Sequence, residues 1–332
     1  MGSRQGAAPI AQAAPEADFA ADVLDGLNGA QKRIPSKYLY DARGSELFER
    51  ICEQPEYYPT RTELNILREQ GAAIAEAVGP RALVLEYGSG SGIKTRLLLD
   101  ALDAPVAYMP VEISYSALAA SVAELAADFP DIEMRALCAD FTHPLTLPAP
   151  QRAAERVLVF FPGSTLGNFA TEEAVDLLAV MRADMGADGL ALVGIDLQKD
   201  PAEIEAAYND AAGVTAAFTL NLLTRINREL DGDFDLDGFA HEARYNSEAG
   251  RVETRLRSRR AQRVTVAGQR FDFAEGEGIL VEYSCKYTQA GFADMARRAG
   301  LRVHRRWTDA GGRFALELLA PTSVDPAGVP GR

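Results

Sequence analysis

Arg81-Ala-Leu-Val-Leu-Glu-Tyr-Gly-Ser-Gly-Ser-Gly-Ile-Lys94 encodes a strand, a glycine-rich turn and the start of a helix. The apolar run at 82–85 is typical of a buried parallel strand, and three alternating glycines follow it closely. From Ile93 the apolar residues recur at helical spacing, so the glycines lie where the strand passes into the helix. Backbone N–H groups at the positive end of that helix are then open to a ligand, because glycine has no β-carbon to cover them.

The spacing of these glycines narrows the kind of ligand. A dinucleotide fingerprint G-x-G-x-x-G that starts at Gly88 requires a glycine at position 93, where the chain has Ile93. The pattern that is present, Glu86-x-Gly88-x-Gly90-x-Gly92, resembles the first motif of S-adenosylmethionine-dependent methyltransferases. Glycine-rich turns also serve tight packing, so this motif alone leaves the ligand open.

Composition and charge exclude several classes of protein. A chain of 332 residues is long enough for about two domains of ~150 residues each. Its 34 Lys and Arg residues against 48 Asp and Glu residues give a net charge of −14, which repels phosphate backbones and anionic lipid headgroups. We therefore expect neither a nucleic-acid partner nor a membrane partner.

The cysteines and the chain termini give no sign of a metal site or of secretion. Cys52, Cys138 and Cys285 match no metal-ligand spacing and are typical of small buried side chains in a reducing compartment. No apolar run approaches the ~18 residues of a membrane span, and the start of the chain lacks a signal-peptide pattern. We expect a cytoplasmic monomer without a metal, in which residues 1–15 form a disordered tail.

The segment before the glycine-rich turn is expected to be mostly helical. Residues 19–27 have helical apolar spacing, and a short helix should begin at about Ser45. Thr60 and Glu63 have the spacing of a capping box that opens a helix ending near Val78. The tyrosines at 57 and 58 are, on their pattern alone, packing aromatics.

After Arg81 apolar strands alternate with helical patterns, which indicates parallel βαβ units in a doubly wound α/β sheet. The second strand, near 106–113, has Glu112 close to its carboxyl end, where a carboxylate can accept hydrogen bonds from ribose hydroxyls. The third strand leads into Asp140 and Phe141, which could bind the adenine amino group and cover the adenine ring. A turn or cap is the alternative role of Asp140.

The fourth strand, 156–161, is the clearest apolar run, and it ends in a loop that contains Gly163, Gly167 and Asn168. In open α/β sheets such loops at the carboxyl edge bind ligands, so we expect the substrate to meet the cofactor here. A fifth strand is predicted at 189–196. The last strands, 301–307 and 314–319, are predicted to form a hairpin that resembles the closing pair of the seven-stranded methyltransferase sheet.

Between the fifth strand and that hairpin lies an insertion, residues 198–286, with its own α+β pattern. Its first helix should start at Asp200, with Glu203 as a capping-box acid, and a second helix is predicted at 215–230. Alternating runs then predict four strands, at 251–258, 263–266, 270–273 and 279–286.

Several motifs in order resemble one particular family, the L-histidine Nα-methyltransferases of ergothioneine biosynthesis, from about residue 20 to residue 320. The matching segments are Pro35-Ser-Lys-Tyr-Leu-Tyr-Asp41, Gly44-Ser-Glu-Leu-Phe-Glu49, Pro55-Glu-Tyr-Tyr-Pro-Thr-Arg-Thr-Glu63, Glu86-Tyr-Gly-Ser-Gly-Ser-Gly-Ile-Lys-Thr95, Gly163-Ser-Thr-Leu-Gly-Asn168, Tyr208-Asn-Asp210, Asn221-Leu-Leu223, Ile226-Asn-Arg-Glu-Leu230 and Glu282-Tyr-Ser-Cys-Lys286.

The resemblance implies a fold, a reaction and a cofactor. The fold is a Rossmann-like, seven-stranded class I methyltransferase domain with a second α+β domain formed by the N-terminal segment and an insertion. We place residues 61–197 and 287–322 in the methyltransferase domain, and residues 16–60 and 198–286 in the substrate-binding domain. The implied reaction is the conversion of L-histidine into Nα,Nα,Nα-trimethylhistidine (hercynine) by three transfers from S-adenosyl-L-methionine.

The resemblance also assigns residues to sites. The cofactor set is Tyr40, Phe48, Gly88, Gly90, Lys94, Glu112, Asp140 and Phe141. The substrate set is Tyr58, Gly163, Asn168, Tyr208, Thr254, Glu282 and Ser284. Within these sets we expect Tyr40 or Tyr58 to orient the amine as the catalytic residues, and Asn168 and Tyr208 to hold the carboxylate.

Glu282 and Ser284 are two residues apart on a predicted strand, so they project from the same face and can address the two ring nitrogens of one imidazole. Lys286 shares that face. The alternative is therefore a solvated strand edge with a weak ion pair between Glu282 and Lys286.

Two positions depart from the family pattern. Glu112 stands where members often have Asp, which lengthens the side chain and keeps the ribose chemistry. Thr254 stands where members have Met near the imidazole, so another aromatic amino acid, such as a tryptophan derivative, is the alternative substrate. From a different class, a non-methylating Rossmann-type binding protein or dehydrogenase is the remaining alternative.

Overall fold

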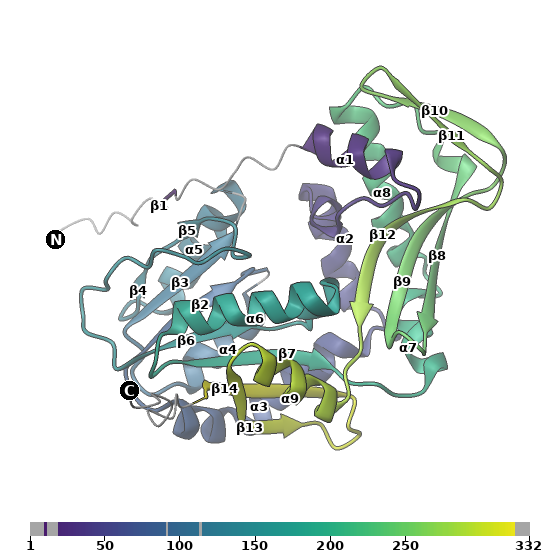
Figure 1. Ribbon diagram of the computed structural model, residues 1–332. Coiled ribbons are helices and arrows are strands. Elements are labelled where there is room, and N and C mark those ends of the chain that lie inside the picture. Colours follow the sequence, from purple (N-terminus) through teal and green to yellow (C-terminus); the bar gives the residue numbers. More distant parts are fainter. Residues whose placement is uncertain (1–9, 12–18, 91, 113–114, 323–332) are drawn as a thin grey trace, which may run out of the picture.

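The computed structural model describes residues 10–11, 19–90, 92–112 and 115–322. Its centre is a large, mostly parallel sheet with helices on both faces (Figure 1). A three-stranded antiparallel sheet and a two-stranded ribbon lie to one side of it, together with the helices of the N-terminal segment.

The central sheet has the order β1-β5-β3-β2-β6-β7-β14-β13, with β4 also paired to β3. Its strands are β1 (Ile10–Ala11), β2 (Ala82–Tyr87), β3 (Ala107–Glu112), β4 (Glu133–Met134), β5 (Leu137–Cys138), β6 (Arg156–Phe161), β7 (Leu190–Asp196), β13 (Leu301–Thr308) and β14 (Phe314–Pro321). Strand β14 pairs antiparallel with both β7 and β13. The α/β fold class and the closing hairpin are confirmed, and the third strand of the predicted seven is divided into β4 and β5.

One part of the expected N-terminal tail differs from the prediction. Ile10 and Ala11 form β1, which pairs in parallel with Leu137 and Cys138 at the edge of the sheet. The rest of residues 1–15 lies outside the described residues.

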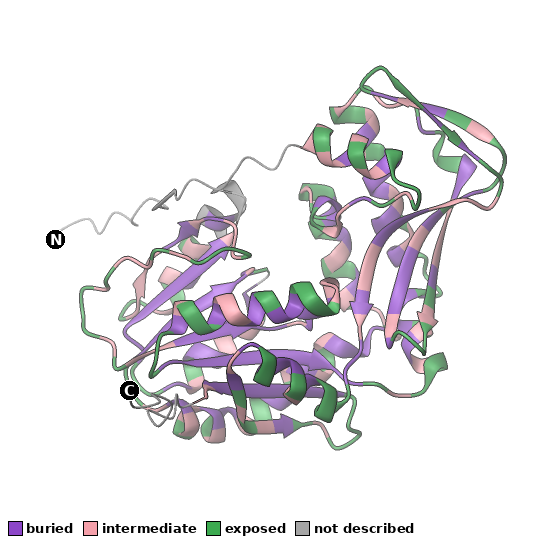
Figure 2. Ribbon diagram, viewed as in Figure 1, coloured by how far each residue is buried: buried purple, intermediate pink, exposed green. Residues whose placement is uncertain are grey.

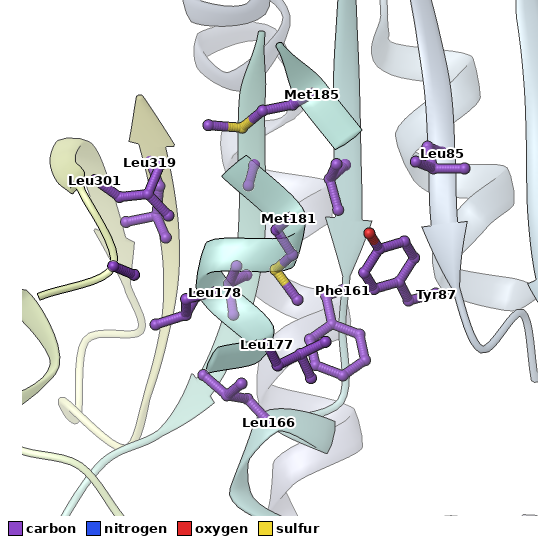
Figure 3. Close-up of a cluster of buried hydrophobic side chains, with 14 of the residues drawn as sticks. Leu85, Tyr87, Phe161, Leu166, Leu177, Leu178, Met181, Met185, Leu301 and Leu319 are labelled. Carbon is purple, nitrogen blue, oxygen red and sulfur yellow. The ribbon is translucent and has the colours of Figure 1, made fainter. Parts of the chain in front are cut away.

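Two layers of helices bury the sheet. The helices are α3 (Tyr58–Val78), α4 (Ile93–Ala101), α5 (Tyr115–Asp128), α6 (Thr171–Met185) and α9 (Gln289–Arg298). On one face, α6 and α9 pack on the apolar cluster that includes Tyr87, Phe161 and Met181 (Figure 3). On the other face, α3, α4 and α5 pack on a second cluster that includes Val84 and Phe160. The inner strands β2, β3, β7 and β14 are correspondingly almost wholly buried, whereas the edge strand β13 is mostly not (Figure 2).

The N-terminal segment and the insertion share a third apolar cluster, which draws on residues from Val23 to Tyr58 and from Ile204 to Val281. The helices here are α1 (Phe19–Asn28), η1 (Ser36–Leu39), α2 (Ala42–Cys52), α7 (Pro201–Tyr208), α8 (Val214–Glu229) and η3 (Leu236–Gly238). The strands are β8 (Phe239–Asn246), β9 (Arg251–Ser258), β10 (Gln262–Val266), β11 (Gln269–Phe273) and β12 (Gly278–Cys285). The domain boundaries themselves stay a prediction.

Strand β8 was not predicted, because charged and polar residues interrupt its apolar alternation and only Phe239 and Ala243 are buried. Helix α2 begins at Ala42, earlier than the predicted Ser45. The carboxylate of Asp41 caps it by accepting a hydrogen bond from the N–H of Gly44 at 2.8 Å.

The predicted capping box of Thr60 and Glu63 is wrong. Helix α3 begins at Tyr58 with Pro59 in its first turn, and no side chain caps it. The Glu63 carboxylate is completely buried and accepts hydrogen bonds from the N–H of Gly163 at 2.9 and 3.0 Å. Gly194 makes room for it, since a β-carbon at that position in β7 would lie 2.2 Å from Glu63 Oε1. The acidic side chain therefore joins α3 to the sheet.

The capping-box role of Glu203 is also not observed. Asp200 does cap α7, by accepting a hydrogen bond from the N–H of Ala202 at 2.9 Å. The Glu203 carboxylate instead accepts a hydrogen bond from Arg313 at 2.6 Å.

Within the described part of the chain, no helix is both long and apolar enough to cross a membrane. The same residues include no cluster of His, Cys, Asp or Glu side chains that could hold a metal ion. All three cysteines are partly buried.

Glu86, at the carboxyl end of β2, is a buried carboxyl group whose protonation should affect stability. Its Oε2 accepts hydrogen bonds from Thr95 Oγ1 at 2.7 Å and from the Tyr108 hydroxyl at 2.5 Å. Burial raises its pKa to about 8, although the two hydrogen bonds act in the opposite direction. The folded protein therefore binds a proton here that the unfolded chain releases at a lower pH.

We predict that the wild type becomes less stable as the pH rises and that Glu86→Gln abolishes this part of the pH dependence. A raised folded-state pKa means that stability falls between the unfolded pKa and about pH 8, by at most about 1.4 kcal/mol per pH unit. The free energy of unfolding, measured in denaturant from pH 5 to pH 8.5, should thus decline less in the variant. Glu46→Gln, on the exposed side of α2, is the control. Parallel curves for Glu86→Gln and the wild type would contradict the prediction.

Candidate functional site

The glycine-rich turn leaves open space at the end of β2. Gly88 and Gly90 have φ angles of 73° and 48°, and a β-carbon on Gly90 would meet nothing within 4 Å. Gly92 precedes α4 without a side-chain cap, so the positive end of this helix faces the turn. At the end of β3, the carboxylate of Glu112 accepts a hydrogen bond from the N–H of Ser89 at 2.9 Å. The structure thus places Glu112 directly beside the turn.

Asp140 and Phe141 follow β5 at the same edge of the sheet. Asp140 Oδ1 accepts hydrogen bonds from the N–H and the hydroxyl of Thr142, at 2.9 and 2.7 Å, so Asp140 forms a turn. Phe141 stacks on Tyr87 with the ring centroids 5.1 Å apart. The roles of both residues toward adenine stay predictions.

Lys94 and Gly163 meet at one carboxylate, although they come from α4 and from the loop after β6. The Lys94 ammonium pairs with buried Glu63 at 2.6 Å, and the same carboxylate accepts from the N–H of Gly163. A β-carbon on Gly163 would lie 3.3 Å from Lys94 Nζ, and its φ of 80° also favours glycine. The predicted cofactor edge and the predicted substrate edge therefore touch at this point.

Tyr40 and Phe48 belong to an aromatic cluster that joins the N-terminal segment to the insertion. Tyr40 lies 5.5 Å from Phe48 and 5.4 Å from Phe218, between ring centroids. Tyr57 joins the cluster through Phe48 at 6.3 Å and Tyr208 at 6.1 Å. Tyr40 nevertheless stays 37 % exposed.

Asp196, the last residue of β7, is the centre of a buried polar network. Its carboxylate is completely buried and accepts a hydrogen bond from the Tyr58 hydroxyl at 2.8 Å. Two lysines pair with it: Lys286 just after β12, at 2.9 Å, and Lys199, at 2.5 Å. Lys199 also donates to the Tyr58 hydroxyl at 2.7 Å.

Lys286 extends this network to the insertion. Its ammonium donates to the Tyr208 hydroxyl at 2.7 Å and to Ser284 Oγ at 2.8 Å, and these two hydroxyls are 2.7 Å apart. The alternative of a solvated ion pair between Glu282 and Lys286 is wrong, because the Lys286 side chain has no exposed surface and pairs with Asp196. Tyr58, Tyr208 and Ser284 are thus connected in one network, and their role toward a substrate stays a prediction.

Glu282 lies on the same face of β12 as Ser284 and is only partly buried. Among the described residues, no hydrogen bond or ion pair engages its carboxylate. Burial raises its pKa to about 7, although the Lys286 charge acts in the opposite direction. Burial also raises the pKa of Tyr40, and the charge on Glu282 adds to that shift. Thr254, 1 % exposed, faces Glu282 in the register of β9.

Asn168 ends the short helix η2 (Thr165–Asn168) and is partly exposed. Its side-chain amide makes no hydrogen bond to another described residue. Helix η2 packs on β12, because a β-carbon on Gly167 would lie 2.9 Å from the carbonyl oxygen of Cys285. Asn168 therefore lies next to the strand that carries Glu282 and Ser284.

The sequence analysis did not assign to a site several residues that hold this site together: Tyr57, Glu63, Asp196, Lys199 and Phe218. Tyr57 and Glu63 belong to a matching family motif, and Asp196 has a signal of its own, as an acidic residue that ends a wholly apolar strand. The others act through contacts between distant segments, which no local pattern indicates.

Comparison with known proteins decides the family. The family described as histidine-specific, S-adenosylmethionine-dependent methyltransferases matches residues 19–321. The chain belongs to this family. It is 44 % identical to the histidine N-alpha-methyltransferase of Mycolicibacterium smegmatis over 90 % of this chain and 93 % of that protein. It is 43 % identical to the histidine N-alpha-methyltransferase of Mycobacterium tuberculosis, over 90 % of this chain and 94 % of that protein. An L-tryptophan methyltransferase of Psilocybe serbica is 26 % identical to this chain, over 90 % of this chain and 92 % of that protein.

Family membership makes the chain a methyltransferase that uses S-adenosylmethionine, so the alternative of a non-methylating binding protein or dehydrogenase is not retained. The residues at the edge of β2 and β3 fit this cofactor. The open space at Gly90 admits a ligand next to the backbone, and Glu112 presents a carboxylate to hydroxyl groups there.

We predict that Glu112→Ala weakens the binding of S-adenosylmethionine and of S-adenosylhomocysteine. A lost hydrogen bond to a charged acceptor is worth about 1.5–3 kcal/mol, so the dissociation constants should rise about tenfold or more in calorimetry. Glu133→Ala is the control, since this carboxylate on neighbouring β4 pairs with Arg135. Equal affinities in Glu112→Ala and the wild type would place the ribose elsewhere.

Proposed function

We propose that the chain methylates the α-amine of L-histidine three times to give Nα,Nα,Nα-trimethylhistidine (hercynine), a step of ergothioneine biosynthesis. Family membership and the names of the two mycobacterial relatives support the reaction. The observation that carries the substrate is the Glu282 carboxylate, which is partly exposed, has no partner among the described residues and has a pKa raised to about 7.

Glu282 is suited to an imidazole ring. Its pKa of about 7 is close to the ~6.5 of an unperturbed imidazole, so ring and carboxylate can share a proton in a hydrogen bond. Ser284 lies two residues along the same strand and offers a hydroxyl to the second ring nitrogen. In this proposal β12 carries the group that recognises the side chain.

Asn168 and Tyr208 are proposed to hold the substrate carboxylate. The Asn168 amide has two N–H donors and no partner among the described residues. The Tyr208 hydroxyl is held by Lys286, at 2.7 Å. Tyr208 contacts Ser284 directly, with 2.7 Å between the two hydroxyls, and the helix η2 that ends at Asn168 packs on β12.

Tyr40 and Tyr58 are proposed to orient the α-amine. Burial raises the pKa of both hydroxyls well above the usual value, so both stay protonated and neither is a strong base. S-adenosylmethionine, when bound, supplies the methyl group on a sulfonium, which is a good leaving group. The residues of this chain therefore contribute by aligning the neutral amine and excluding water.

A tryptophan derivative is the second candidate substrate, and Thr254 is the observation that favours it. Thr254 faces Glu282 across the strands, and its small side chain leaves more room beside the ring than the Met of family members. The 26 % identical L-tryptophan methyltransferase supports this alternative. Glu282 favours histidine, because an imidazole has two nitrogens that can share a proton with it.

We further propose that the protein acts as a cytoplasmic monomer without nucleic-acid or membrane partners. Its net charge of −14 supports the absence of anionic partners. We also propose that residues 16–60 and 198–286 form the substrate domain. The apolar cluster that these two segments share supports this assignment.

We predict that Asn168→Ala raises the KM for histidine about tenfold or more and leaves cofactor affinity nearly unchanged. The reason is the loss of a hydrogen bond to a charged carboxylate, worth about 1.5–3 kcal/mol. Steady-state kinetics and calorimetry measure the two effects. An equal loss of cofactor affinity would place Asn168 in the cofactor pocket.

We predict that Glu282→Ala lowers kcat/KM for histidine about a hundredfold or more and shifts preference toward tryptophan or phenylalanine. Histidine and tryptophan compete in one reaction, and product masses report both the preference and the number of methyl groups. Glu277→Ala, next to the other end of β12 and paired with Lys32, is the control. An unchanged preference would place Glu282 outside the pocket, and a wild type that favours tryptophan would support the role of Thr254.

A further inference from the structure

Each lysine of the Asp196 network has three oxygen atoms of the protein as close partners of its ammonium group. Lys286 donates to Tyr208 and Ser284, at 2.7 and 2.8 Å, and pairs with Asp196 at 2.9 Å. Lys199 donates to Asp196, to the Tyr58 hydroxyl and to the carbonyl oxygen of Leu197, at 2.5, 2.7 and 2.5 Å. An ammonium group has three donors and no acceptor. Neither lysine can therefore bind a ligand without giving up one of these contacts.

The hydroxyl of Tyr58 can only accept a hydrogen bond from a ligand, because its own hydrogen is already used. A phenolic hydroxyl has one hydrogen and two lone pairs. The hydrogen goes to Asp196, and one lone pair accepts from Lys199. The remaining lone pair can accept a hydrogen bond, as an amine N–H requires.

The hydroxyls of Tyr208 and Ser284 are left with one hydrogen for a ligand. Each accepts from Lys286, and one of the two donates to the other across 2.7 Å. The pair has two hydroxyl hydrogens, and one of them is used in the hydrogen bond between Tyr208 and Ser284. One hydrogen is therefore left to donate to a ligand. Contact with an ammonium group polarises such a donor and strengthens it toward an anionic acceptor.

The network also carries an unbalanced charge in a buried place. Two ammonium groups share one carboxylate, and Lys286 and Asp196 have no exposed side-chain surface. The charged groups that act on it from neighbouring elements are Glu203 on α7, which pairs with Arg313, and Glu282 on β12. The reactive form of an amino acid, with a neutral amine, carries one negative charge on its carboxylate and so complements the network.

We propose that Asp196, Lys286 and Lys199 are positioning residues that fix the direction of hydrogen bonding at the substrate: Tyr58 accepts from the α-amine, and the Tyr208–Ser284 pair donates one hydrogen bond to the carboxylate. This inference rests on the proposed function. It also restricts that function, because Ser284 then meets the imidazole as an acceptor. The lysines act through hydroxyls and do not touch the substrate.

Three ligands separate this positioning role from a merely structural one: histidine, imidazole-4-propionate, which lacks the amine, and histamine, which lacks the carboxylate. Calorimetry is done in the presence of S-adenosylhomocysteine. Lys286→Met should weaken the two carboxylate ligands about tenfold or more and histamine less than about threefold. Lys32→Met is the matched control, since Lys32 pairs with Glu277 at 2.5 Å, next to the other end of β12.

Lys199→Met gives a second, independent readout. This substitution removes one positive charge near the bound substrate, so the pKa of the substrate's α-amino group should rise. The acid limb of the kcat–pH profile should therefore move to higher pH by about half a unit or more, and Lys32→Met should leave it in place. This readout still decides the question if Lys286→Met fails to bind S-adenosylhomocysteine.

Equal weakening of all three ligands by Lys286→Met, unchanged affinities, or an unshifted acid limb in Lys199→Met would each overturn the inference. A wild-type protein that binds histidine but methylates only tryptophan would contradict the proposed substrate and leave the positioning role standing. A wild type that binds none of the three ligands would contradict the proposed function, and the inference with it.

Discussion

The buried carboxylate of Asp196 is the contact on which the arrangement of the site depends. It lies at the end of β7 in the central sheet, and its partner Lys286 follows β12 of the insertion, at 2.9 Å. Taking two such charges out of water is costly, and removing one partner of a buried pair typically costs about 3–5 kcal/mol. Asp196 is therefore bound to its lysines in the folded state, and the hydroxyls of Tyr58, Tyr208 and Ser284 are fixed relative to the sheet through them.

A second buried carboxylate, Glu63, connects separate elements in the same way at the predicted cofactor edge. It comes from α3, occupies the space that Gly194 leaves in β7, and holds both the N–H of Gly163 and the ammonium of Lys94. Asp196 lies two residues after Gly194 on the same strand. The two anions thus join the loop at Gly163 and the network around Tyr58 to one strand, and in the proposed function this arrangement would hold the amine and the methyl group at a constant distance. Alignment of this kind is the main contribution that methyl transfer requires of a protein.

Helices and strands that local sequence patterns encode could be predicted. Features that depend on contacts between distant segments of the chain could not. The strands β2, β6 and β9 are strongly patterned and were found with nearly correct ends. Strand β8 was missed because its face is only partly apolar, and Glu63 was misassigned because a capping-box spacing cannot reveal a partner one hundred residues away at Gly163. Site residues followed from family motifs, whereas the roles of Asp196 and Lys199 became clear only from their contacts in the structure.

The central claim is that this site orients one amino acid by three chemically different ends. The most direct test is a crystal structure of the protein with S-adenosylhomocysteine and histidine. The account predicts the imidazole ring at Glu282, the carboxylate at Asn168 and Tyr208, and the α-amine within hydrogen-bonding distance of Tyr58 and facing the cofactor sulfur. Electron density that places the carboxylate at Glu282 or the imidazole ring at Asn168 would contradict it.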